Sequence, residues 1–151
     1  MAVISNSVII RCTPEQAFDY LSDLRSELEW NPTCERMEKV TDGPVGPGTR
    51  FRAKWKLSLV VELEVLEYDR PKRWTAHNGG PLEVTMTVRL EPVPDGTRLS
   101  TDFDARAHGF LRVIFPILLR KLRADERANM GHIRKALERR DGTDATTHST
   151  S

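Results

Sequence analysis

The stretch VIIRCTPEQAFDYLSD, residues 8–23, marks the passage from a strand to a helix. Thr13 stands where a helix N-cap is expected, Pro14 suits the first helical position, and Gln16 completes a capping box. Apolar residues then recur at helical spacing, at Ala17, Phe18, Leu21 and Leu24. The stretch therefore predicts a strand over about the first nine residues, followed by a short helix with one buried face.

Working outward, residues 26–30 predict a second short helix. It must end there because Asn31 precedes Pro32, and a residue before proline disfavours helical geometry. From residue 34 to 107 the apolar period changes to two, which is typical of half-buried strands. In a hairpin turning near Ser58, Lys54 would face Glu62 and Trp55 would face Val61.

A second hairpin is predicted around Asp95 and Gly96, where a two-residue turn would pair Val88 with Phe103 and Met86 with Ala105. Between the hairpins, residues 73–78 predict a short strand with Trp74 and Ala76 facing inward. These patterns indicate six or seven antiparallel strands joined by short turns.

The last predicted element is a long helix over residues 110–140, which Pro116 should kink or interrupt. Its expected apolar face consists of Phe110, Ile114, Ile117, Leu118, Leu122, Met130, Ile133 and Leu137. The expected fold class is α+β: a curved antiparallel sheet wrapped around this helix, with two short helices after the first strand. Residues 1–140 form one domain in this interpretation, and residues 141–151 a disordered tail.

Composition excludes several classes of protein. The chain has 151 residues, of which 38% are hydrophobic and 30% charged, with a formal net charge of +1. No apolar run reaches the ~18–20 residues of a membrane span, and no signal peptide is visible. The two cysteines show no CxxC spacing, and the near-neutral charge argues against a nucleic-acid binder. A cytoplasmic, single-domain protein is expected.

Four motifs and the long helix together resemble the SRPBCC superfamily, the START-like or helix-grip proteins that include polyketide cyclase/dehydrase-type members. The motifs are VIIRCTPEQAFDYLSD (8–23), WNP (30–32), GPVGPGTRF (43–51) and VLEYDRPKRWTAH (65–77). They are structural motifs and none is catalytic. The resemblance implies a hydrophobic pocket between sheet and long helix, and functions that range from carriage to catalysis.

Large apolar residues on the concave face of the sheet and on the helix are the candidate ligand-binding residues. For each one, an ordinary place in the core is the favoured alternative. The candidates are Trp30, Phe51, Trp55, Leu63, Trp74, Met86, Phe103, Phe110, Ile114 and Leu118.

Glu67, Asn78 and His108 are weak catalytic candidates. Alternation places Glu67, Asn78 and Thr101 inward, and an inward carboxylate beside an apolar pocket is suited to acid–base chemistry. The favoured alternative for Glu67 is a strand end or bulge that reaches water. His108 lies where the last strand meets the long helix and is a candidate at the pocket mouth, with a solvated hinge as the alternative. No motif for a metal or another cofactor is present, and neither is expected.

The long helix carries a charge imbalance. Residues 110–140 hold nine Arg or Lys and three Asp or Glu, a net charge of +6, whereas the rest of the chain carries −5. Such a helix suits a membrane surface or a partner protein, although a solvated face is the favoured interpretation.

The leading functional hypothesis is binding of a hydrophobic small molecule that is lipid-, polyketide- or aromatic-like, by a monomer or homodimer without nucleic acid. A cyclase/dehydrase-like enzyme that uses the same pocket without metal is the first alternative, and a non-enzymatic carrier is favoured over it. A protein- or membrane-interaction module built on the basic helix is the second.

Overall fold

The computed structural model describes residues 2–56 and 58–149, with side chains described as far as Arg140. The strands are β1 (Ala2–Ile10), β2 (Cys34–Lys39), β3 (Arg50–Trp55), β4 (Val61–Asp69), β5 (Arg73–Asn78), β6 (Leu82–Val93) and β7 (Gly96–Ala107). The helices are α1 (Pro14–Ser22), the 3-10 turn η1 (Leu24–Ser26), α2 (Glu27–Trp30) and α3 (Leu111–Ser149).

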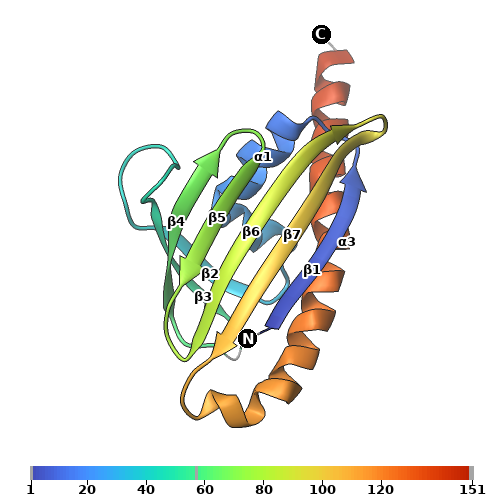
Figure 1. Cartoon of the computed structure of the whole chain (residues 1–151). Helices are drawn as coiled ribbons and strands as arrows, with labels where there is room; N and C mark the ends of the chain where they lie inside the picture. The colour runs from blue at the N-terminus through green and yellow to red at the C-terminus, as the bar shows by residue number, and fades with distance from the viewer. Residues whose placement is uncertain (1, 57, 150–151) are drawn as a thin grey trace.

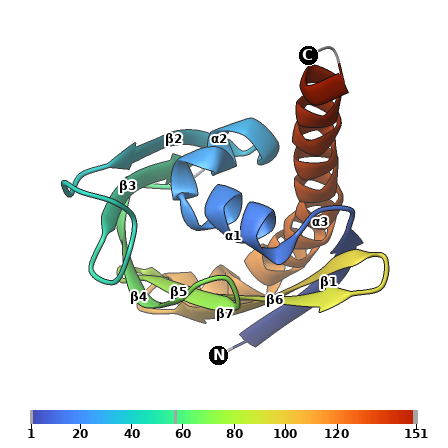
Figure 2. The ribbon, with the colours of Figure 1, turned by 90° about the horizontal axis from the view of Figure 1, so that it is seen from above.

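The seven strands form one antiparallel sheet in the order β1-β7-β6-β5-β4-β3-β2. The sheet curls so that α1 and α2 lie on its concave side, as Figure 2 shows from above. The long helix α3 runs beside β1 and also contacts β7 and α2 (Figure 1). The predicted α+β helix-grip fold is therefore confirmed.

The predicted start of α1 is confirmed in detail. Thr13 is the N-cap, and its hydroxyl accepts a hydrogen bond of 3.1 Å from the backbone N–H of Gln16. In return, the Gln16 side chain accepts one of 2.9 Å from the backbone N–H of Thr13. Pro14 begins the helix, where its missing N–H would have had no partner. The capping box thus fixes where the chain turns from β1 into the concave side of the sheet.

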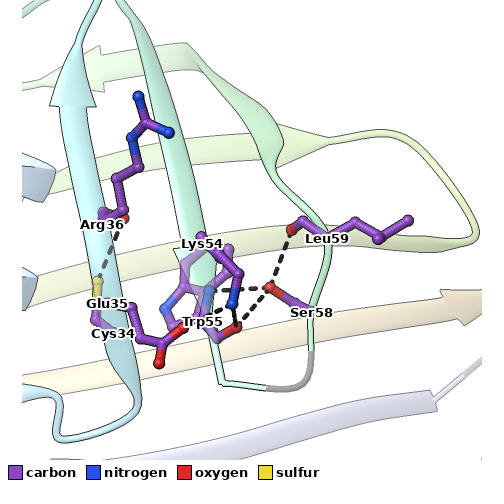
Figure 3. Close-up of polar contacts among 7 residues, drawn as sticks. All are labelled: Cys34, Glu35, Arg36, Lys54, Trp55, Ser58 and Leu59. Atoms are coloured by element: carbon purple, nitrogen blue, oxygen red, sulfur yellow. Dashed lines mark hydrogen bonds and ion pairs between the residues drawn. The ribbon is translucent and has the colours of Figure 1, made fainter.

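The register predicted for β3 and β4 is wrong by two residues. Arg52 pairs with Glu62 and Ala53 with Val61, while Lys54 forms its ion pair with Glu35 of β2. The hydroxyl of Ser58 bonds to the backbone N–H and carbonyl of Trp55, which closes a wider turn than expected (Figure 3). A two-residue shift keeps every side chain on its face, so alternation alone does not distinguish the two registers.

The register of β6 and β7 differs from the prediction in the same way. Met86 pairs with Phe103, and the turn residues are Pro94 and Asp95 instead of Asp95 and Gly96. Gly96 has a φ of +137°, and a Cβ there would lie 2.1 Å from the carbonyl oxygen of Ile10. This glycine therefore serves a close approach of two backbones at the start of β7.

Helix α3 differs from the prediction at both ends. It begins at Leu111, includes Pro116 within one continuous helix, and its backbone extends past Arg140 to Ser149. The domain limit at residue 140 stays a prediction, as does the tail, although this helical backbone enters the segment expected to be disordered. Residues 150 and 151 lie outside the described residues.

One end of the concave face, here called the α1 end, is tightly packed. The side chain of Phe18 on α1 is fully buried and packs edge-on against the ring of Tyr68, with 5.0 Å between the ring centroids. Inner-face residues at this end, including Val88, Leu90 and Leu99, are also buried. Burial of such side chains contributes about 1.5–3 kcal/mol each, so this end holds the stabilising core.

Candidate ligand-binding site

The other end of the concave face, here called the open end, is only half-buried. It lies where β4 and β6 begin and β5 and β7 end, as the strand pairing requires. Its half-buried inner residues are Trp55, Val61, Leu82, Val84, Met86, Phe103 and Ala107. Since these apolar side chains keep accessible surface on the inner side of the sheet, the short helices do not fill this end.

Two carboxyl side chains, Glu27 and Glu126, come together near the open end. Glu27 begins α2, and Glu126 lies on α3 four residues before buried Met130. Helical spacing places Glu126 in the stripe of Met130, Ile133 and Leu137, which packs into the core. The two carboxyls thus approach from different helices, and the charge of Glu27 acts on Glu126.

The Glu27 carboxyl is surrounded by hydrogen-bond donors. Asn31 donates through Nδ2 to Oε1 at 3.4 Å, and the side chains of Trp55 and Cys34 also hydrogen-bond to it. Desolvation by burial opposes these donors and prevails, raising the pKa of Glu27 to about 7. Glu27 is therefore divided between its neutral and ionised forms at neutral pH.

Glu126 has no compensating contact. It makes no hydrogen bond or ion pair with any residue of the part of the chain that the structure describes. Desolvation, with repulsion from Glu27 and Asp125, raises its pKa to about 8. Glu126 is thus mostly protonated at neutral pH and has an O–H group free to donate.

The two carboxyls are sheltered from water without being fully buried. Both side chains keep some accessible surface, yet the protein surrounds them closely enough for desolvation to dominate the pKa. A protonated carboxyl there can donate one hydrogen bond and accept others, so the pair suits a polar group on a bound molecule.

The structure places the ten predicted ligand-binding residues in three groups. Half-buried side chains are Trp30, Trp55, Met86, Phe103 and Leu118, and buried core side chains are Phe51, Leu63 and Trp74. The remaining two, Phe110 and Ile114, are exposed. Placing these two on the inward face of the helix was wrong, because the half-buried side of the first turns of α3 carries Leu111, Phe115, Leu118 and Leu122.

None of the three weak catalytic candidates enters the open end as a free polar group. Glu67 is exposed beside a bulge in β4 and forms an ion pair with Arg73 at 3.2 Å. The inward placement by alternation is therefore wrong, and the favoured alternative, a bulge that reaches water, is confirmed. Asn78 is buried, and its Nδ2 donates to the carbonyls of Gly79 and Leu82 at 3.0 Å each, which holds the turn. His108 is exposed and contacts Glu83 at 2.9 Å on the rim.

The carboxyl pair was missed in the sequence. A signal existed for Glu126, because Leu122, Glu126, Met130, Ile133 and Leu137 share one helical stripe. Glu27 gave none, since α2 spans one turn and shows no periodicity. Pairing the two required knowing that α2 packs on α3.

Metal and thiol chemistry find no support in this region. Within the described residues, no group of three or more His, Cys, Asp or Glu side chains is arranged to hold a metal ion. Desolvation, with the charge of Glu27, raises the pKa of Cys34 to about 12, so this thiol stays protonated. Its Sγ donates to the carbonyl oxygen of Arg36 at 3.7 Å, and Figure 3 draws this contact.

Solved structures share this architecture at low sequence identity. The protein TTHA0849 from Thermus thermophilus is 17% identical with a TM-score of 0.74, over 90% of this chain and 97% of that chain. The Aha1 dimer from Colwellia psychrerythraea is 13% identical with a TM-score of 0.69, over 91% and 97%. Ara h 8.0201 is 15% identical with a TM-score of 0.60, over 87% and 97%. At these identities the likeness concerns the fold alone.

No curated protein matches the sequence. No helix among the described residues is long and apolar enough to cross a bilayer. The family model described as polyketide cyclase / dehydrase and lipid transport matches residues 1–138. With nearly the whole chain matched and the helix-grip fold in place, the protein belongs to the polyketide cyclase / dehydrase and lipid transport family of the SRPBCC superfamily.

Proposed function

We propose that the protein binds a hydrophobic small molecule at the open end of the concave face, with a polar oxygen of that molecule at Glu27 and Glu126. The observation that carries the proposal is the pairing of half-buried apolar side chains with two sheltered carboxyls that lack a compensating cation. Apolar walls with a few convergent polar groups are typical of small-molecule sites. The ligand class is lipid-, polyketide- or aromatic-like.

The carboxyl pair predicts a preference among head groups. A neutral hydroxyl or carbonyl oxygen accepts a hydrogen bond from protonated Glu126 and adds no charge to the pair. A carboxylate ligand of the same chain length would add a negative charge where no cation compensates it, which costs free energy in a desolvated site. Long-chain alcohols and ketones should therefore bind more tightly than fatty acids at neutral pH.

Native mass spectrometry at pH 7 with dodecanol and dodecanoate tests this preference. We expect a 1:1 complex with dodecanol and a weaker one with dodecanoate. Glu126→Ala should weaken the dodecanol complex about tenfold, because a hydrogen bond in a buried site is lost. Glu67→Gln is the matched control, since this exposed carboxyl faces away. Absence of both complexes, or equal loss in the control, would contradict the proposal.

A cyclase-like activity is the second candidate, and the closeness of both pKa values to neutrality favours it. In such a reaction the ionised Glu27 takes a proton from the carbon between two carbonyls of a poly-β-ketone. That carbon attacks a distant carbonyl carbon, and protonated Glu126 gives its proton to the carbonyl oxygen. The product is a ring bearing a hydroxyl.

Incubation of a synthetic poly-β-ketone thioester with the wild type, Glu27→Gln and Glu67→Gln distinguishes catalyst from carrier. A cyclase accelerates ring formation in the wild type and in the Glu67 variant, but not in the Glu27 variant. If the wild type leaves the uncatalysed rate unchanged while still binding dodecanol, the protein is a carrier.

A further inference from the structure

Large apolar side chains are exposed at one end of the molecule. Phe110, Val113 and Ile117 keep 78%, 74% and 76% of their surface accessible, and Leu59 keeps 75%. We name these four residues, with half-exposed Val60, the apolar rim. Side chains of this size rarely gather exposed on a monomeric protein unless the patch binds something.

The rim belongs to two segments at the same end of the sheet. Val113 and Ile117 lie four residues apart on one side of α3, and Phe110 is the residue directly before this helix. Leu59 and Val60 lie in the turn between β3 and β4. Strand pairing brings the start of β4 to the end of the sheet where β7 ends, and Figure 1 shows both segments at its lower end.

The surroundings of the rim are positive. Residues 106–123 contain four Arg and one Lys and no acidic residue, and residues 54–60 contain two Lys and no acidic residue. Arg120 lies three residues after Ile117 on the same side of α3, and Arg123 follows one turn later. Along the described chain, neither arginine has an ion-pair partner, and the same holds for Arg112 and Lys56.

We infer that the apolar rim docks the protein on the surface of an anionic lipid bilayer. Exposed apolar side chains enter the boundary between headgroups and acyl chains, and flanking Arg and Lys side chains contact anionic headgroups. The charge complementarity selects this partner over a second copy of the chain, because two copies would bring the same unpaired cations together. Docked in this way, the open end of the concave face lies next to the bilayer.

Vesicle flotation of the full chain tests the docking. Wild-type protein should float with phosphatidylcholine vesicles containing 30% phosphatidylserine, and much less with pure phosphatidylcholine. Raising the salt concentration should weaken the binding. Ile117→Ser should lower partitioning about tenfold, since an exposed side chain of this size loses its burial in the bilayer. Arg120→Glu with Arg123→Glu should lower it at least about 25-fold, at about fivefold per cation removed.

Two controls keep the result specific. Leu66→Ser changes an exposed leucine on β4, outside the rim, and Arg134→Glu with Lys135→Glu changes cations farther along α3. Both variants should float as the wild type does.

Sedimentation of the same proteins tests whether a second copy of the chain covers the apolar rim instead. If Ile117→Ser turns a dimer into a monomer and no variant changes flotation, the rim is a contact between copies, and the inference is overturned. Equal binding to neutral and anionic vesicles would overturn it as well. Dodecanol binding is measured separately, so failure of docking leaves the proposed function standing.

Discussion

Replacing Glu126 by Gln should stabilise the protein, and increasingly so as the pH rises. Folding raises the pKa of this carboxyl from 4.5 to about 8, chiefly by desolvation. The folded state therefore retains a proton that the unfolded chain releases above about pH 4.5. The stability that the protonated carboxyl contributes below pH 4.5 is lost progressively up to about pH 8. Glutamine never ionises, so the variant does not suffer this loss.

The structure sets the size of the effect. A pKa difference between 4.5 and about 8, at about 1.4 kcal/mol per pH unit, corresponds to about 5 kcal/mol above pH 8. This is a ceiling, because an ionised carboxyl at the wall of an open space draws water towards itself. Part of the pKa shift of Glu126 comes from repulsion by Glu27. The stabilisation by Glu126→Gln should therefore be smaller in a protein in which Glu27 is also replaced by Gln.

Urea unfolding at pH 5 and pH 9 measures the effect. We expect the free energy of unfolding of Glu126→Gln, relative to the wild type, to rise by about 2–4 kcal/mol between these two pH values. Glu67→Gln, which removes an exposed carboxyl paired with Arg73, should show no comparable rise. A pH-independent difference for Glu126→Gln would refute the claim that this carboxyl is desolvated.

Three further outcomes follow from the packing. Gly96→Ala should lower the free energy of unfolding, measured by thermal unfolding, by more than about 2 kcal/mol, because the new Cβ would lie 2.1 Å from the carbonyl oxygen of Ile10. A loss below about 1 kcal/mol would show that the two backbones separate freely. Thr13→Ala should cost about 1 kcal/mol of unfolding free energy through loss of the capping box, and an unchanged midpoint in urea would argue against that box. Phe51→Ala should lower the free energy of unfolding by about 3–5 kcal/mol, since its side chain is fully buried. Phe103→Ala, at a half-buried side chain, should lower it by less and should weaken dodecanol binding. Equal losses of unfolding free energy would contradict the division into a packed end and an open end.

Local signals in the sequence sufficed for the elements and the fold class. The capping box at Thr13 and the strand at Arg73–Asn78 both occur as predicted, because short-range hydrogen bonds and alternation determine them. The strand registers could not be predicted from the sequence, because a shift by two residues keeps every side chain on its face. Only the geometry of the turns determines the register. At Ser58 a side-chain hydroxyl closes the turn, and at Gly96 a backbone approach from β1 requires the glycine.

The candidate site was less predictable than the fold. Half of the predicted ligand-binding residues are half-buried as a pocket wall requires, but apolar character alone did not show which ones fill the core. Phe110 and Ile114 were placed inward because the apolar residues at the start of α3 surround the helix on most sides. Glu27 and Glu126 are separated by most of the chain, so their meeting is a property of the tertiary structure.

Photo-crosslinking with a diazirine-bearing long-chain alcohol, followed by peptide mapping, tests the central claim most directly. The account predicts labels on the open end, at residues such as Trp55, Met86 and Phe103, and competition by unlabelled dodecanol. Glu126→Ala should lower their yield, whereas Glu67→Gln should not. Labels confined to exposed residues such as Leu66, or labelling that dodecanol does not reduce, would contradict binding at this site.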